Sequence, residues 1–431
     1  MGRKQINSYL VRLVVLKSGE RLPMLCRRST GIPLFEPTVY AITELRAQNR
    51  ASSTIQQALR AVMVLCLVLD RLEIDLNLRL SEGRLLELGD IDELVRWCRL
   101  PLEAFTEDSE RSRHGSRVVS LEKTRMKAPM QGPAEIDPNT VAIRIHYIRN
   151  YLKWRADGHM LKLGRNRTDP SLSNLKINSE IVLRSLDERI PPVFGRNEVE
   201  LRQGMSESDL ATLIDVIPPD SPENPWKGDH AKERNALIVW WFLTLGIRRG
   251  ELLGVRVPDV DFQTNEVLIA RRADDPDDPR ANEPNTKTRD RLLSLEEDLA
   301  VLTRRYVTGA RSRIEGARRH DYLFVANGTG APLSLSGLNK IFVELRRKCP
   351  SLPEDLYPHI FRHTWNDRFS DLMDTRKVSE ETEKKMRAKL MGWSETSGTA
   401  AMYTRRHTAR KAKEASLALQ AQFKPRRKDE S

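Results

Sequence analysis

The sequence has few cysteines, and they follow no binding pattern. Its 431 residues include four: Cys26, Cys66, Cys98 and Cys349. None forms a C-x-x-C pair and no histidine stands at zinc-finger spacing from any of them, which argues against a disulfide framework and a structural zinc site. We therefore expect reduced thiols in a cytoplasmic protein, with no metal. A run of about 18 apolar residues is also lacking, so neither a membrane-spanning helix nor a membrane partner is expected.

The charge balance, by contrast, is strongly positive. There are 72 Lys and Arg against 60 Asp and Glu, a net charge of +12. Residues 404–431 contain nine Lys or Arg and three Asp or Glu, so half of the net charge lies in this segment. A basic protein with a basic carboxyl end indicates a polyanionic partner.

The chain length predicts two or three domains, at roughly 100–200 residues per domain. Residues 1–45 form an N-terminal extension, a β-hairpin or an arm, because strand-like stretches flank the turn at 17–20. Residues 46–186 form a helical domain, and a Pro/Gly-rich linker follows at 187–205. In the helical domain, the S-x-x-Q pattern from Ser53 indicates one helix start and Asp137-Pro138 another.

The second domain is predicted at 206–407. Ser206 is expected to cap its first helix, and Arg234–Leu245 is a nearly continuous apolar helix suited to a core. Residues 260–295 have strand character around an acidic loop, and helices resume near Ser336. The loop lacks the Gly and the final Glu of a calcium loop, so we assign it no metal. Residues 408–431 are predicted as a C-terminal helix and a basic tail.

Five short motifs in the second domain carry the chemistry. They are Gly246-Ile247-Arg248-Arg249-Gly250-Glu251-Leu252, Thr286-Lys287-Thr288, His359-Ile360-Phe361-Arg362-His363-Thr364, Leu390-Met391-Gly392-Trp393, and Tyr403. In order and spacing they resemble the tyrosine recombinase (phage integrase) family. That family carries G-(L/I/M)-R-x-x-E-L, K-T on a hairpin, H-x-x-R-H-T, L-G-(H/W) and a final Tyr. The resemblance covers roughly residues 200–410, the family's catalytic domain.

The resemblance implies a fold and an activity. The fold would be mainly α with a small β-sheet: a helical core-binding domain and a mixed α/β catalytic domain that form a C-shaped clamp on DNA. The activity would be site-specific recombination or integration, which cuts and rejoins DNA through a 3′-phosphotyrosyl intermediate without metal, cofactor or ATP. The implied partners are double-stranded recombination sites, further protomers in a tetramer, and accessory recombination proteins, in the cytoplasm and on the nucleoid.

Arg248 and Arg362 are the expected phosphate clamp. Guanidinium groups suit it, because their planar fork binds two phosphate oxygens and stays charged at any working pH. Glu251, one helical turn after Arg248, would orient that side chain. By the resemblance, Lys287 would protonate the departing 5′ oxygen, with nearby arginines lowering its pKa. Arg289 is the alternative to Lys287.

His359 and Arg362, one turn apart, should project from one helical face. His359 could hydrogen-bond the phosphate and assist deprotonation of the nucleophile, whereas His363 is expected to point elsewhere and pack in the core. Trp393 stands where many family members have a second histidine, and its indole can donate a hydrogen bond but cannot relay a proton. Tyr403 would be the nucleophile, with Tyr357 as a competitor that the family pattern disfavours.

Basic residues outside the motifs are candidate DNA contacts. Arg144, Arg149 and Lys153 lie off the apolar stripe of the helix that begins at Pro138, and Arg405 and Arg406 follow Tyr403. Two other functions remain open from the sequence. One is a degenerate recombinase that acts as a DNA-binding regulator, and the other is a relaxing enzyme of the type IB topoisomerase class.

Overall fold

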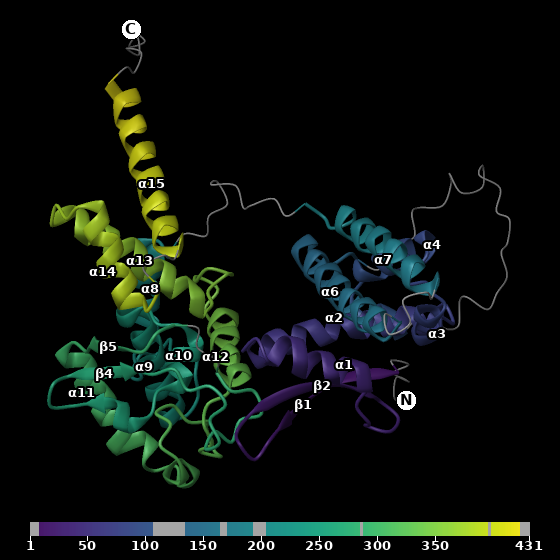
Figure 1. The fold of residues 1–431 in the computed structure, drawn as a ribbon. Coiled ribbons are helices and arrows are strands. Elements are labelled where there is room, and N and C mark those ends of the chain that lie inside the picture. Colours follow the sequence, from purple (N-terminus) through teal and green to yellow (C-terminus); the bar gives the residue numbers. More distant parts are fainter. Residues whose placement is uncertain are drawn as a thin grey trace, which may run out of the picture. The chain divides into compact units, whose positions relative to one another are not determined.

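The computed structural model describes residues 8–106, 134–163, 170–192, 204–284, 288–394 and 398–422, without the side chains of 399, 401, 405, 406, 409, 421 and 422. The chain divides into two compact units, Met1–Gly195 and Arg196–Ser431 (Figure 1). Both are mostly helical, and two small sheets complete the described part, as expected for a mainly α fold. Most of the predicted linker, residues 193–203, lies outside the described residues.

Unit 1 begins with the predicted hairpin. Strands β1 (Tyr9–Val15) and β2 (Arg21–Arg27) pair antiparallel, with Tyr9 opposite Arg27. The hairpin is no separate arm, because Tyr9 and Leu25 are buried in the same hydrophobic cluster as the helices that follow. Within the predicted extension, the described residues from Tyr9 onward therefore contribute to the core of unit 1.

Helix α2 (Ser52–Arg71) is the centre of that core. The predicted capping box at Ser53 is wrong, since the N-cap is Ala51 and no side chain caps the helix. The expectation of no membrane-length apolar stretch also needs correction. By length and by a mean hydropathy of 1.5, α2 could cross a membrane, yet 56% of that window is buried inside the unit. This is the pattern of a central core helix.

The other helices of unit 1 surround α2. Helix α6 (Pro138–Leu163) starts as predicted, with the Asp137 carboxylate accepting a hydrogen bond from the Thr140 N–H at 3.1 Å. Its stripe of Val141, Ile145, Ile148 and Leu152 is buried, as expected from the helical spacing. The remaining helices are α1 (Phe35–Tyr40), α3 (Leu76–Ser81), α4 (Leu88–Cys98) and α7 (Pro170–Glu188).

Unit 2 combines helices with one three-stranded sheet. Strands β3 (Val260–Asp261), β4 (Glu266–Ile269) and β5 (Arg291–Ser294) lie in that order, all antiparallel. Its helices are α8 (Glu207–Val216), α9 (Asp229–Leu245), α10 (Arg249–Gly254), α11 (Glu297–Tyr306), α12 (Leu335–Lys348), α13 (Pro358–Thr375), α14 (Glu380–Met391) and α15 (Gly398–Gln422). Ser206 caps α8 as predicted, whereas the sequence interpretation missed α11.

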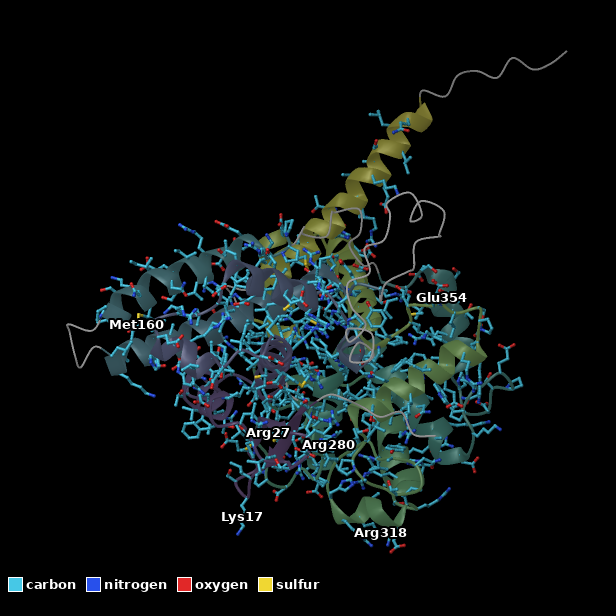
Figure 2. All side chains as sticks on the ribbon, turned by 90° about the vertical axis from the view of Figure 1, so that its right-hand side faces the viewer. Lys17, Arg27, Met160, Arg280, Arg318 and Glu354 are labelled. Carbon is cyan, nitrogen blue, oxygen red and sulfur yellow. The ribbon has the colours of Figure 1, made fainter. Side chains whose placement is uncertain are left out.

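The acidic loop after β4 is held to the rest of unit 2 by a buried arginine. Arg280, labelled in Figure 2, is buried and pairs with Asp278 at 2.8 Å. The same guanidinium donates to the Leu253 and Leu333 carbonyl oxygens at 3.0 and 2.9 Å. The loop therefore fastens the carboxyl end of α10, the helix that contains the second half of the first motif.

Helix α9 is the core helix that the sequence predicts. Trp241 and Phe242 are fully buried, and the Phe242 ring stacks on Phe361 of α13 with centroids 6.0 Å apart. The helix ends at Gly246, which adopts a left-handed conformation with φ 58°. This packing brings the first motif, which starts at Gly246, against the H-x-x-R-H-T motif on α13.

We predict that Gly246→Ala destabilises unit 2. A non-glycine residue is strained at this φ, and an added Cβ would lie 2.7 Å from the Trp365 ring. The expected loss is about 1–3 kcal/mol of unfolding free energy, measured by urea denaturation. Gly254→Ala is the matched control, because no atom lies within 4 Å of its added Cβ. Equal effects of both substitutions would contradict the prediction.

Candidate active site

The first part of the site is the short connection between α9 and α10. After Gly246 the chain extends, and Arg248 is the N-cap residue of α10. Glu251, in the first turn of α10, accepts a hydrogen bond from the Arg248 backbone N–H at 2.8 Å, and its Oε1 lies 3.6 Å from Arg248 Nη1. The R-x-x-E spacing thus lets one carboxylate cap the helix and hold the arginine, as a capping box does.

Glu251 is the buried centre of the site, 2% exposed. Arg291, the first residue of β5, donates to both of its carboxylate oxygens at 3.2 and 3.0 Å, and the Thr288 hydroxyl donates to Oε1. Burial by itself would raise the pKa of Glu251, but the hydrogen bonds and charge of Arg291 outweigh it and hold the pKa below the ordinary value of 4.5. Glu251 is therefore an ionised, fully engaged carboxylate.

Arg291 was missed as a site residue in the sequence. Its Nε also donates to the Leu390 carbonyl oxygen at 2.6 Å, which ties the hairpin to the Leu390–Trp393 motif. In β5 the side chains of Arg291 and Leu293 face inward, while those of Leu292 and Ser294 are exposed. The sequence did contain a signal for this role, because Arg291 occupies an inward-facing strand position and a buried charge requires a partner.

Arg362 on α13 is 1% exposed. Its Nη1 donates to the Gly246 carbonyl oxygen at 2.7 Å and its Nη2 to the Met391 carbonyl oxygen at 3.3 Å. Burial, with the charge of Arg248 nearby, lowers the pKa of Arg362 to about 9. The side chain thus stays cationic at neutral pH and is fixed between two motifs that are far apart in the sequence.

Trp393 and Tyr403 stack face to face. Their centroids are 5.6 Å apart with planes 10° from parallel, and the Arg362 guanidinium lies 5.1 Å from the Trp393 ring. Among the predicted site residues that the structure describes, Arg248 Nη1 and Trp393 Nε1 are buried donors with no hydrogen-bond partner. Unpartnered buried donors are rare in folded proteins and indicate a site for an acceptor.

Tyr403 lies in α15 and is 4% exposed. Its hydroxyl oxygen is 3.2 Å from His363 Nδ1, so the expectation that His363 points elsewhere is wrong. His363 is buried, as predicted, but on the site's side of α13, since residues i and i+4 share a helical face. The exposed His359 meets its ring edge-on, with centroids 4.6 Å apart.

A second buried arginine, also missed in the sequence, lies under the tyrosine. Arg387 on α14 is fully buried, and its guanidinium is 5.8 Å from the Tyr403 ring centroid. It forms an ion pair with Glu383 and donates to the Asn366 side chain at 3.0 Å and to the Ser370 hydroxyl at 2.6 Å. This network fixes a positive charge below the phenol ring.

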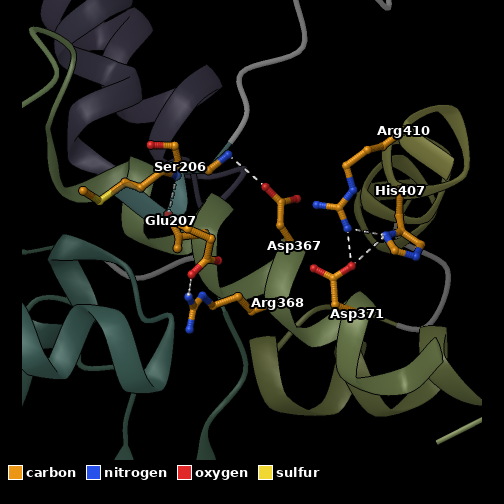
Figure 3. A pocket seen from close by; sticks show the side chains of 10 residues that line it. Ser206, Glu207, Asp367, Arg368, Asp371, His407 and Arg410 are labelled. Carbon is orange, nitrogen blue, oxygen red and sulfur yellow. Dashed lines mark hydrogen bonds and ion pairs between the residues drawn. The ribbon is translucent and has the colours of Figure 1, made fainter. Parts of the chain in front are cut away.

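Helix α15 is fastened to α13 just after the tyrosine. His407 lies 2.7 Å from the Asp374 carboxylate, and Arg410 pairs with Asp371. Asp371, His407 and Arg410 border a cavity of about 310 Å³ between α13, α15 and the segment that leads into α8 (Figure 3). Since α15 runs unbroken to Gln422, across the predicted boundary at 407–408, Tyr403 and the C-terminal segment share one helix.

The remaining predicted residues are either outside the described part of the chain or in unit 1. Lys287 and the side chains of Arg405 and Arg406 lie outside the described residues. In unit 1, Arg144 donates to the Cys98 and Leu100 carbonyl oxygens at 3.1 and 2.7 Å, which gives it a role in packing α6 against α4. Arg149 pairs with Asp187 at 2.6 Å and Lys153 with Asp157 at 2.6 Å. Their contact with DNA stays a prediction.

The site and the comparisons agree on the class of protein. A guanidinium-rich cluster around a buried tyrosine, spread over four motifs, is what the tyrosine recombinase resemblance predicts. Residues 205–410 match the model of the phage integrase family. The matched segment, most of unit 2, is therefore a tyrosine recombinase domain of the phage integrase type.

Two relatives are similar over much of their length. Tyrosine recombinase XerA of Thermococcus kodakarensis is 22% identical over 258 residues, which are 56% of this chain and 79% of the relative. Tyrosine recombinase XerC of Bacillus pumilus is 23% identical over 269 residues, 62% of this chain and 73% of the relative. Among solved structures, XerA recombinase matches with a TM-score of 0.35 and 18% identity, over 66% of this chain and 83% of its own. XerH recombinase bound to palindromic difH substrate matches with a TM-score of 0.41 and 16% identity, over 76% of this chain and 84% of its own.

We predict that Glu251→Gln destabilises the protein in a pH-dependent way. At neutral pH it leaves buried guanidinium groups without their counter-ion, at an expected cost of about 3–5 kcal/mol. A carboxylate whose pKa is lowered by folding contributes stability above its ordinary value of 4.5 and loses that contribution as the pH falls through the folded value. The difference between variant and wild type should therefore shrink in acid.

Urea denaturation from pH 7 down to pH 3 measures this difference. Glu315→Gln is the matched control, because that side chain is 93% exposed and its ion pair with Arg319 has a separation of 3.6 Å. Such surface pairs contribute at most about 1 kcal/mol. A pH-independent difference for Glu251→Gln would show that its carboxylate is not the buried counter-ion.

Proposed function

We propose that this recombinase cuts DNA by attack of the Tyr403 hydroxyl oxygen on a backbone phosphorus. The attack forms a 3′-phosphotyrosyl bond and releases a 5′ hydroxyl. The covalent bond conserves the energy of the cut phosphodiester, so rejoining by a partner strand's 5′ hydroxyl needs no ATP. The observation that carries the proposal is the pair of unpartnered buried donors, Arg248 Nη1 and Trp393 Nε1, beside a stacked and buried tyrosine.

The charge balance of the cluster supports an anionic ligand. Three guanidinium groups, of Arg248, Arg291 and Arg362, lie around the carboxylate of Glu251. One carboxylate leaves an excess of positive charge in a low-dielectric site, where preorganised donors stabilise a developing phosphorane far more than in water. Arg291 is fully used by Glu251 and Leu390, so the proposed phosphate ligands are Arg248 and Arg362.

The remaining roles follow from chemistry and from the family pattern. His359, exposed at the edge of the site, would hydrogen-bond a phosphate oxygen. Trp393 would donate its indole N–H to the same phosphate without relaying a proton. Lys287 would protonate the 5′ oxygen as it leaves.

We further propose that recombination proceeds in a tetramer on two double-stranded DNA sites, through a Holliday junction. The two units would close as a clamp on DNA. Beyond its contacts with α13, the distal part of α15 exposes Leu417 and Leu419, 54% and 56% accessible, which would dock on a neighbouring protomer. The sequence of the recombined DNA site would identify the genetic element on which the protein acts and the accessory proteins that assist it.

We predict that Tyr403→Phe binds DNA but forms no covalent adduct, because the ring and its stacking remain while the nucleophilic oxygen is lost. The test exposes the protein to a library of nicked duplexes with random sequence around the nick. A nick beside the cut site lets the released fragment diffuse away and traps the adduct. Adducts that survive denaturing electrophoresis are recovered and sequenced.

Three outcomes separate the candidate functions. A site-specific sequence in wild-type adducts, with none from Tyr403→Phe, supports the recombinase proposal. Adducts without sequence preference, together with plasmid relaxation by dilute monomer, would favour the topoisomerase-like alternative. DNA binding with no adduct from the wild type would leave a DNA-binding regulator and overturn the proposed chemistry.

We also predict that Trp393→Phe slows adduct formation about 10²–10³-fold while DNA affinity changes little. Phenylalanine can keep the stacking on Tyr403 but removes the unpartnered indole N–H. Single-turnover rates on the selected duplex measure the effect. Trp240→Phe, an exchange on the partly buried face of α9, is the matched control. A rate within about threefold of wild type would show that the indole donor is not used in the transition state.

A further inference from the structure

The second histidine of the H-x-x-R-H-T motif contacts the nucleophile directly. His363 Nδ1 lies 3.2 Å from the Tyr403 hydroxyl oxygen, within hydrogen-bond distance. The two rings are 5.7 Å apart at 45°, and both side chains are buried, at 6% and 4% exposure. The contact therefore joins a titratable base to the reacting atom in a site shielded from bulk water.

Tyr403 must lose a proton when it attacks. A phenol has an ordinary pKa of about 10, so a phenol free in water is protonated at neutral pH and needs an acceptor for its proton when it attacks. General-base catalysis requires an acceptor within hydrogen-bond reach of that proton. His359, to which the sequence interpretation gave this task, is exposed, and its ring contacts that of His363 edge-on, with centroids 4.6 Å apart.

The charges that surround the pair favour proton transfer. Arg248 on α10, Arg362 on α13 and Arg387 on α14 all attract an ionised Tyr403, and Glu383 partly offsets Arg387. The same cations disfavour a lasting positive charge on His363. The acceptor should therefore be the neutral imidazole and should pass the proton on quickly. The exposed His359, edge-on to His363, provides a route to solvent.

We propose that His363, not His359, is the catalytic group that accepts the proton of Tyr403. This inference rests on the proposed nucleophilic role of Tyr403. As the bond from Tyr403 Oη to phosphorus forms, the Oη–H bond breaks and its proton moves to His363 Nδ1. The bond from phosphorus to the 5′ oxygen breaks, and that oxygen takes a proton from the general acid, the role assigned to Lys287. The proton on His363 leaves through His359 to solvent.

The decisive experiment compares single-turnover adduct formation on the selected nicked duplex across pH for wild type, His363→Asn, His363→Gln and His363→Ala. Loss of a general base typically slows a reaction about 10²–10⁴-fold, so we expect at least a 100-fold loss at neutral pH with DNA binding retained. In the wild type the rate should rise with pH and level off once the imidazole is neutral. In the variants the rate should keep rising with pH, because solvent then has to take the proton of Tyr403.

Two further measurements separate proton acceptance from a structural role. Imidazole added to His363→Ala should restore part of the rate. A duplex with a 5′-bridging sulfur, whose thiolate leaves without a proton, should rescue Lys287→Ala but not His363→Asn. His320→Gln is the matched control, because that half-buried histidine of unit 2 bonds the Gly330 carbonyl oxygen, apart from the site. The adduct-formation rate and thermal midpoint of His320→Gln give the effect of a histidine-to-amide exchange outside the site, with which His363→Gln is compared.

The outcomes are distinct. A slow His363→Gln variant with wild-type thermal stability, an altered pH profile and imidazole rescue of the alanine variant support the inference. A rate within about threefold of wild type, or rescue of His363→Asn by the bridging sulfur, would overturn it while leaving Tyr403 as nucleophile. If the wild type itself forms no adduct, the proposed function fails and this inference fails with it.

Discussion

The site depends on one buried carboxylate. Glu251 is nearly inaccessible, yet it meets Arg291 through two hydrogen bonds, Arg248 through its backbone and side chain, and Thr288 through its hydroxyl. Isolated buried charges are very costly, so a cluster of guanidinium groups can persist only around a well-bonded counter-ion. Because Glu251 has one negative charge for several cations, it holds the arginines in place and leaves positive charge for a further anion.

Helix termini bring the distant motifs to this carboxylate. Gly246 and Gly392, both left-handed, end α9 and α14 and turn the chain toward Arg362 and Arg291. Their carbonyl oxygens accept hydrogen bonds from the Arg362 side chain and from the Arg289 backbone, at 2.7 and 3.1 Å. The charged side chains of Arg362 and Arg291 thus also fasten the chain at Gly246 and at Leu390, so the geometry and the electrostatics of the site are set together.

Sequence reasoning found the motifs because their spacing has a direct local meaning. Gly246 ends a helix, Glu251 follows Arg248 by one turn, and His359 and Arg362 lie one turn apart on α13. It did not find the contacts that only packing creates. The inward turn of Arg291 in β5, the position of Arg387 beneath the Tyr403 ring and the direction of His363 depend on how α13, α14 and α15 meet. The cap of α2 was misjudged because Ser53 is already inside the helix.

The most direct test of the account identifies the residue that becomes bonded to DNA. Wild-type adduct trapped on a nicked duplex is digested with protease and nuclease, and the nucleotide-bearing peptide is sequenced by mass spectrometry. The account predicts a 3′-phosphonucleotide on the oxygen of Tyr403. The same modification on Tyr357, or on any residue other than Tyr403, would contradict it.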